Sequence, residues 1–72
     1  MQSQLRIMRI QKNLTQAKLA SMIQSHQTLI SKYEKNLSKP SVKNMQKLAI
    51  ALDVDLKTIL ECFYGGPNEI EI

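Results

Sequence analysis

The sequence predicts an all-α protein, an orthogonal bundle of five short helices. Three observations lead to this prediction. Apolar residues recur at helical spacing along most of the 72-residue chain. No strand-type alternation runs through its body, and short segments with turn chemistry separate the periodic stretches. A chain of this length forms one small domain, whose modest buried surface often needs the help of a partner subunit.

Two helices are expected in the first third of the chain. The first covers residues 3–12 and ends at Asn13; the residues on its helical stripe are Leu5, Met8 and Lys12. Thr15, a good N-cap residue, opens the second helix, although Lys18 stands where a capping box would have an acid. The residues of the second helix expected to point inward are Leu19, Met22 and Ile23.

Three more helices are expected after a tight connection. Ser25 or His26 opens the third, and a polar loop over residues 36–40 follows it. Ser41 caps the fourth helix and Asp55 the fifth, with a break at residues 53–55 between them. The apolar residues expected to hold these helices to the core are Leu29, Ile30 and Tyr33, then Val42, Met45, Leu48, Ala49 and Leu52, then Leu56, Ile59, Leu60 and Phe63.

The chain divides into a helical domain over residues 1–62 and a C-terminal tail over residues 63–72. Gly65-Gly66-Pro67 ends all helix, and the alternation in residues 68–72 is compatible with an extended conformation. Ile7 and Ile10 lie opposite the inward stripe of the first helix. Either they are ordinary surface residues, or tail residues of this chain or a partner cover them; the candidates are Phe63, Tyr64, Ile70 and Ile72. The tail is therefore a candidate dimer contact.

The charges of the chain are unevenly distributed. Residues 1–52 hold nine lysines and arginines against one acid, Glu34, a net charge of +8. Residues 53–72 hold one lysine against five acids, a net charge of −4. A basic surface attracts polyanions such as nucleic acid, whereas the alternative is a merely soluble, lysine-rich surface.

Composition also argues against several classes of protein. The single cysteine, Cys62, excludes an internal disulfide framework, and we expect it to be a small buried hydrophobe. No apolar stretch has the length of a membrane span and no signal-peptide pattern begins the chain, so a cytoplasmic location and no membrane contact are expected. One histidine, no paired acids near it and no glycine-rich phosphate loop predict neither an enzyme nor a cofactor or metal site.

The third helix offers side chains suited to reading DNA. Those that project away from its apolar side are Gln27, Thr28, Ser31 and Lys32. The major groove admits one helix, in which glutamine can pair with adenine, threonine can meet thymine, and lysine can reach guanine or a phosphate. Gln16, in the first turn of the second helix, is suited to a phosphate, and could hydrogen-bond to Gln27 if the two helices cross closely. Taken singly, such residues are more often merely solvated, so the signal lies in their joint arrangement.

A longer set of residues supports the same interpretation. It consists of Leu14-Thr15-Gln16, Leu19-Ala20, Ile30-Ser31-Lys32-Tyr33-Glu34, Lys39-Pro40-Ser41, Leu48-Ala49, Ala51-Leu52-Asp53-Val54, Leu56 and Ile59-Leu60. The segment 14–60 thereby resembles the lambda-repressor/Cro-like, or Xre-type, helix-turn-helix family. The resemblance implies DNA binding, usually by dimers on palindromic operators and usually to repress. It implies base contacts at Gln27, Thr28, Ser31 and Lys32, and phosphate contacts at Gln16, Asn36, Lys39, Arg9 and Lys12.

The chain departs from the family pattern at three positions. Gln24 stands in the turn where glycine is common, which has a conformational cost if its φ is positive. His26 stands where serine or threonine usually caps the third helix, and Ser25 could take that role and shift the helix start by one residue. Asn36 replaces glycine after the third helix and is the next best residue for a left-handed C-cap.

The expected function is that of a DNA-binding transcriptional regulator, a repressor by resemblance, acting on double-stranded DNA as a homodimer joined through its C-terminal part. The rival is an antitoxin or anti-regulator that acts mainly through a protein partner, such as a toxin, because the same fold serves both roles. The +8 segment favours DNA.

Overall fold

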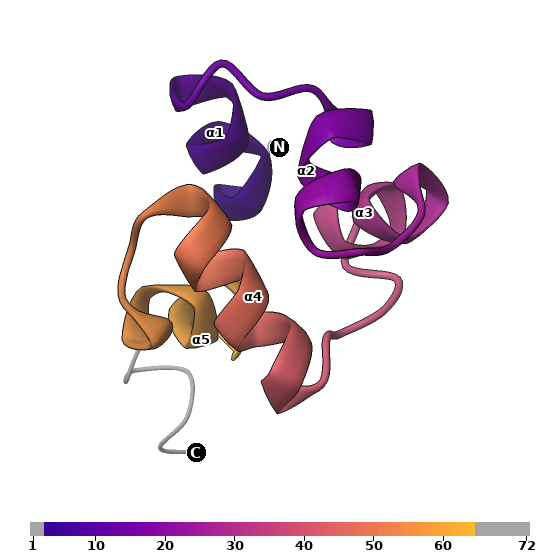
Figure 1. Ribbon diagram of the computed structural model, residues 1–72. Helices are drawn as coiled ribbons and strands as arrows, with labels where there is room; N and C mark the ends of the chain where they lie inside the picture. The colour runs from indigo at the N-terminus through magenta and orange to yellow at the C-terminus, as the bar shows by residue number, and fades with distance from the viewer. Residues whose placement is uncertain (1–2, 65–72) are drawn as a thin grey trace.

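Five α-helices follow one another through residues 3–64, the part of the chain that the computed structural model describes (Figure 1). They are α1 (Gln4–Gln11), α2 (Gln16–Met22), α3 (Gln27–Glu34), α4 (Val42–Leu52) and α5 (Leu56–Tyr64). α2 packs against α3 and α4 against α5, while α1 lies against both α3 and α5. The described residues contain no strand. The prediction of an all-α fold with five helices is therefore confirmed.

Hydroxyl side chains begin three of these helices. The hydrogen bonds run from the backbone N–H groups of Arg6, Lys18 and Asn44 to the side-chain oxygens of Ser3, Thr15 and Ser41. Each satisfies an N–H group that the helix itself leaves without a partner. α3 begins differently, because His26 occupies the N-cap position without a side-chain hydrogen bond and Gln27 is the first helical residue. Of the two expected starts of this helix, the structure shows the one at His26.

Each of the first four helices is followed by a residue in the left-handed region. These residues, none of them glycine, have φ between 57° and 59° and are Asn13, Gln24, Asn36 and Asp53. After each of them the next N–H returns to a carbonyl five positions earlier, as from Ser25 to Ala20 at 2.8 Å. This is the Schellman hydrogen-bond pattern, which satisfies the last carbonyls of a helix. The positive φ at Gln24 confirms that this turn needs a left-handed residue, at a cost for a residue with a Cβ.

The core lies where the five helices meet. Its buried residues are Leu5, Leu19, Ala20, Ile23, Ile30, Tyr33, Met45, Leu48, Ala49, Leu52, Ile59 and Phe63. The rings of Tyr33 and Phe63 meet edge to face, with 5.6 Å between their centroids, and so join α3 to α5. Because Phe63 is buried and α5 runs to Tyr64, the bundle continues two residues beyond the boundary expected at residue 62.

Three residues expected to face the core are exposed, so these predictions are wrong. Met22, Val42 and Leu60 expose 43%, 64% and 40% of their surface. Successive helical residues are rotated by about 100°. Ile23, the C-cap residue of α2, and Ile59 of α5 are buried, and this rotation turns the adjacent Met22 and Leu60 to the flank. Val42 is the first residue of α4, at the end of the helix that extends beyond its neighbours (Figure 1).

α1 has two apolar residues, Ile7 and Ile10, on the side opposite Leu5 and Met8, and the protein covers them only partly. Ile7 is half-buried and Ile10 is exposed. Of the candidates to cover them, Phe63 belongs to the core, whereas Ile70 and Ile72 lie outside the described residues. The expected extended conformation of the tail lies outside them as well.

Candidate nucleic-acid interface

α3 has a buried side and an accessible side. Ile30 and Tyr33 are buried and Leu29 is half-buried, which holds the helix against α2 and the core. The accessible residues are Gln27, Thr28 and Lys32, which are exposed, and Ser31, which is half-buried. The four side chains predicted to address bases therefore share the open side of α3, starting at its first residue. Their contacts with DNA stay a prediction.

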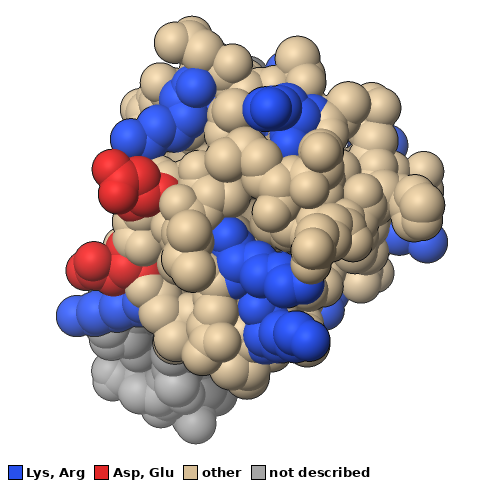
Figure 2. Space-filling view, viewed as in Figure 1, with Lys and Arg blue, Asp and Glu red and all other residues tan. Residues whose placement is uncertain are grey.

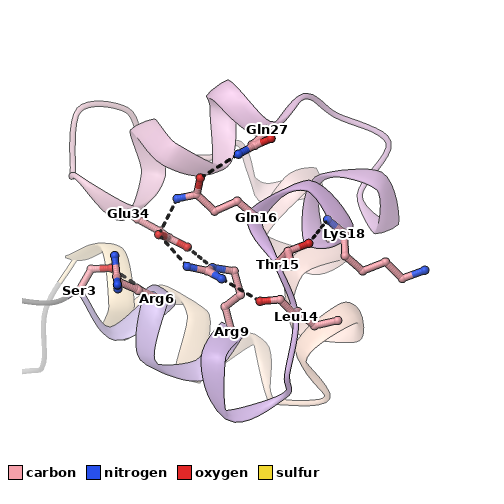
Figure 3. Close-up of polar contacts among 9 residues, drawn as sticks. All are labelled: Ser3, Arg6, Arg9, Leu14, Thr15, Gln16, Lys18, Gln27 and Glu34. Atoms are coloured by element: carbon pink, nitrogen blue, oxygen red, sulfur yellow. Dashed lines mark hydrogen bonds and ion pairs between the residues drawn. The ribbon is translucent and has the colours of Figure 1, made fainter.

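A chain of hydrogen bonds joins the start of α3 to α1 (Figure 3). Gln27 Nε2 donates to Gln16 Oε1 at 3.3 Å, and Gln16 Nε2 donates to Glu34 Oε1 at 3.0 Å. Arg9 Nε donates to Glu34 Oε2 at 2.5 Å, and Arg9 Nη1 donates to the Leu14 carbonyl at 2.7 Å. The expected hydrogen bond between Gln16 and Gln27 is thus confirmed, and it requires the close crossing of α2 and α3.

Arg9 belongs to the interior of the protein. Its side chain is 10% exposed and that of Glu34 is 5% exposed. An unpaired charge in the interior is costly, so a buried guanidinium and carboxylate depend on each other. The Arg9 guanidinium is occupied by Glu34 and by the Leu14 carbonyl. The expected phosphate contact at Arg9 stays a prediction, for a side chain that is only 10% exposed. We assign Arg9 the structural role of holding α1 to the end of α3.

Two lysines expected to meet phosphates are exposed and lie beside other groups. Lys12 Nζ is 3.9 Å from a carboxylate oxygen of Asp53, in an exposed ion pair of the kind that contributes little stability. Lys39 Nζ lies 4.4 Å from the centroid of the Tyr64 ring. A ring face attracts the cation but accepts none of its N–H groups in a conventional hydrogen bond. The Lys39 ammonium therefore keeps donors for a further partner.

Basic side chains are spread more widely over the surface than acidic ones, and some of them adjoin the acids (Figure 2). In Figure 2, lysine and arginine side chains gather over α4, while acidic side chains lie at the edge near the turn between α4 and α5. Glu34, the one acid among residues 1–52, is buried and paired with Arg9. All the exposed charges of residues 3–52 are consequently positive. A surface of this kind raises the local concentration of polyanions.

A concavity of about 440 Å³, here called the α1–α3 concavity, opens beside the accessible side of α3. Its lining residues are Ser3, Arg6, Gln16, Ser31, Glu34, Lys35 and Asn36. It brings Gln16 and Asn36, both predicted to contact phosphates, together with Ser31. Arg6 and Lys35 were not expected here. Nothing in the local sequence marks Arg6, since only the packing of α1 beside α3 brings it to this place, whereas Lys35 could have been suspected from its neighbour Asn36.

Three further properties of the described residues concern metal ligands, the cysteine and helix length. Residues 3–64 contain no group of three histidines, cysteines or acids that could hold a metal ion. Cys62 is half-buried against the core, and burial, with a smaller effect of the Glu61 charge, raises the pKa of its thiol. Within the same range, no helix combines the length and apolar character that crossing a bilayer requires.

Comparison with known proteins agrees with this geometry. A family model described as helix-turn-helix matches residues 5–59, which run from the start of α1 into α5. No curated protein and no solved structure gives a match. The matched range includes α2, α3 and the turn between them, together with most of the core. Since it spans well over half of the chain, the protein belongs to the lambda-repressor/Xre-like helix-turn-helix family of DNA-binding transcription regulators.

Proposed function

We propose that this protein is a sequence-specific transcriptional repressor that binds a palindromic operator as a homodimer. The observation that carries the proposal is the accessible polar side of α3, on a helix whose opposite side is buried in the core. The major groove is wide enough for one such helix. The exclusively positive exposed charge of residues 3–52 supplies the general attraction to the duplex.

Base recognition is assigned to Gln27, Thr28, Ser31 and Lys32. Gln27 and Thr28 begin α3, and the N-terminal end of a recognition helix is the part that reaches base edges. Gln27 uses one N–H of its amide on Gln16, which is itself held by Glu34. The second N–H and the oxygen of the Gln27 amide stay available, and these are the two groups that pair with adenine.

Phosphate contacts are assigned to Gln16, Asn36, Lys39 and Lys12. These contacts would fix the position of α3 on the duplex without selecting a sequence. Asn36, Lys39 and Lys12 are exposed, which supports this assignment, whereas Gln16 is half-buried. Lys39 also keeps N–H donors for a phosphate, because its neighbour is the Tyr64 ring. Their share of the affinity should fall as salt concentration rises.

A homodimer joined through its C-terminal part would place one α3 in each of two successive major grooves. Half-site centres would then lie about 10 bp apart. Leu60 and Tyr64, both on α5, leave 40% and 46% of their surface exposed, which supports a contact at this end of the bundle. A small domain also gains stability from a partner subunit.

The test is selection of bound sequences from a random DNA pool, followed by binding of the selected duplex to variants. Gln27→Ala and Thr28→Ala should each weaken binding by about 1–3 kcal/mol and relax one base position, because each removes contacts to one base edge. Gln46→Ala is the matched control, since Gln46 is an exposed glutamine on α4.

Two outcomes would contradict the proposal. An unchanged base preference in both α3 variants would remove them from the reading face. No binding to any duplex at low salt would favour a regulator that acts through a protein partner.

A further inference from the structure

All the residues that line the α1–α3 concavity are polar or charged. Its one acid, Glu34, is neutralised by Arg9, which is buried with it. Arg6 and Lys35 are exposed. Within residues 3–64 the salt bridges are Arg9–Glu34 and Lys12–Asp53, so neither Arg6 nor Lys35 has a carboxylate partner there. The concavity therefore has an excess of positive charge with donors to spare.

The position of the concavity connects this charge to α3. Gln16 and Ser31 line it, and both also belong to the surface proposed to meet DNA. Arg6 reaches it from α1, on the side of that helix that faces α3 (Figure 3). A DNA strand bordering the groove that holds α3 would pass this opening. A phosphodiester is the anion that such a strand presents, once per nucleotide.

We propose that Arg6 and Lys35, together with Gln16 and Asn36, form a binding site for one phosphodiester of the DNA backbone. This inference rests on the proposed DNA-binding function and adds two residues to it. The Arg6 guanidinium can give two parallel N–H groups to the phosphate oxygens, whereas the Lys35 ammonium acts as a point charge. The amide groups of Gln16 and Asn36 would position the same phosphate.

The first experiment compares salt dependence of binding. Arg6→Gln and Lys35→Gln are measured with the selected duplex by fluorescence anisotropy between 0.05 and about 0.5 M salt. Lys57→Gln is the matched control, because it also removes one positive charge but lies on α5 outside the concavity. Each concavity variant should flatten the slope of log K against log salt by about 0.9, which corresponds to about eightfold weaker binding at 0.1 M salt. Lys57→Gln should keep the slope of the original protein.

The outcomes separate this inference from the function on which it rests. If the original protein binds with a steep salt slope and both concavity variants share that slope, the proposed phosphodiester site is wrong and the proposed function stands. If the original protein binds no duplex, both are wrong. Circular dichroism melting shows that each variant is folded; Arg6 and Lys35 make no side-chain hydrogen bond within residues 3–64, so neither substitution should unfold the protein.

A second experiment identifies the source of the phosphate. One phosphate of the duplex at a time is replaced by a neutral methylphosphonate. At the phosphate that occupies the concavity, this replacement should weaken DNA binding by the original protein but leave binding by Arg6→Gln almost unaffected. Both changes remove the same contact. Inorganic phosphate is titrated separately and followed by NMR. A saturable site for inorganic phosphate that Arg6→Gln abolishes, without any such coupling to the duplex, would assign the concavity to a free anion and overturn the proposal.

Discussion

The two halves of the bundle share one apolar core but differ in their side-chain hydrogen bonds. In the half formed by α1, α2 and α3, the side-chain hydrogen bonds of Gln27, Gln16, Glu34 and Arg9 run through the junction of all three helices. Between α4 and α5, the described residues show no side-chain hydrogen bond. The contacts there are apolar, and the buried residues are Met45, Leu48, Ala49, Leu52, Ile59 and Phe63.

The difference follows from what each half has to provide. Apolar burial supplies free energy but is non-directional, so it tolerates small rotations of a helix. Hydrogen bonds and buried ion pairs act only at particular distances and angles. The polar half contains α3, whose Gln27 and Thr28 have to reach base edges. We infer that the polar junction orients α3, whereas α4 and α5 mainly stabilise the fold.

The largest expected effect comes from breaking the buried ion pair. Glu34→Ala should lower the free energy of unfolding by about 3–5 kcal/mol, because it leaves the Arg9 guanidinium buried without its carboxylate. That loss is comparable with the total stability of a small domain, so the variant should be largely unfolded at 25 °C. Urea denaturation followed by circular dichroism measures it.

A double variant tests whether orientation is the real contribution of the pair. Arg9→Met with Glu34→Leu fills the same space without charge and should restore stability to that of the original protein or above it. It should still bind the selected duplex more weakly, since Gln16 loses its acceptor on Glu34. Full stability together with unchanged DNA affinity would contradict the orienting role.

A smaller loss is expected from the apolar half. Leu48 is fully buried in α4, and Leu48→Ala should lower the free energy of unfolding by about 3 kcal/mol through lost burial and a residual cavity. Ile50→Ala is the control on the same helix, because Ile50 is 81% exposed and its truncation should change stability by no more than about 0.5 kcal/mol. The folded fraction of Leu48→Ala should keep the base preference of the original protein. A changed preference would show that α4 also orients α3.

The smallest effect lies at a contact between the two halves. Lys47 Nζ on α4 donates to Gln24 Oε1 in the turn between α2 and α3, at 3.2 Å and on the surface. Gln24→Gly should raise the free energy of unfolding by about 0.5–1 kcal/mol, because relief of the left-handed backbone exceeds the extra entropy of glycine. Gln24→Ala keeps the backbone cost and removes the hydrogen bond, so it should be nearly neutral. A loss of stability in both variants would mean that the Lys47–Gln24 contact matters more than the turn.

Most of the helices and their ends could be predicted from local patterns. The capping roles of Thr15 and Ser41 and the helical stripe of α4 are examples. Each depends on neighbours within one or two helical turns, so the spacing of residues in the sequence indicates it directly. Met22 and Leu60 were misplaced because an apolar residue at the flank of a stripe has the same local pattern as one at its centre. Which of two adjacent apolar residues faces inward depends on the partner helix.

The candidate site also has residues that could be predicted from the sequence and residues that could not. The accessible residues of α3 follow from the position of its buried residues, so Gln27, Thr28 and Lys32 could be named from the sequence. Arg9 could not be distinguished from a surface cation. Its partner Glu34 lies 25 positions away, and only the packing of α1 on α3 removes both side chains from water.

The sequence alone determined three features of this protein: the helix-turn-helix unit from Thr15 to Glu34, its helical periodicity, and the +8 charge of residues 1–52. Each of them depends only on residue type and local spacing. The tertiary structure decided which charges are exposed. It buries Arg9 with Glu34 and brings Arg6, Gln16, Lys35 and Asn36 around one concavity. The physical reason is that solvation and ion pairing depend on distances between helices, and these are set by the packing of the whole core.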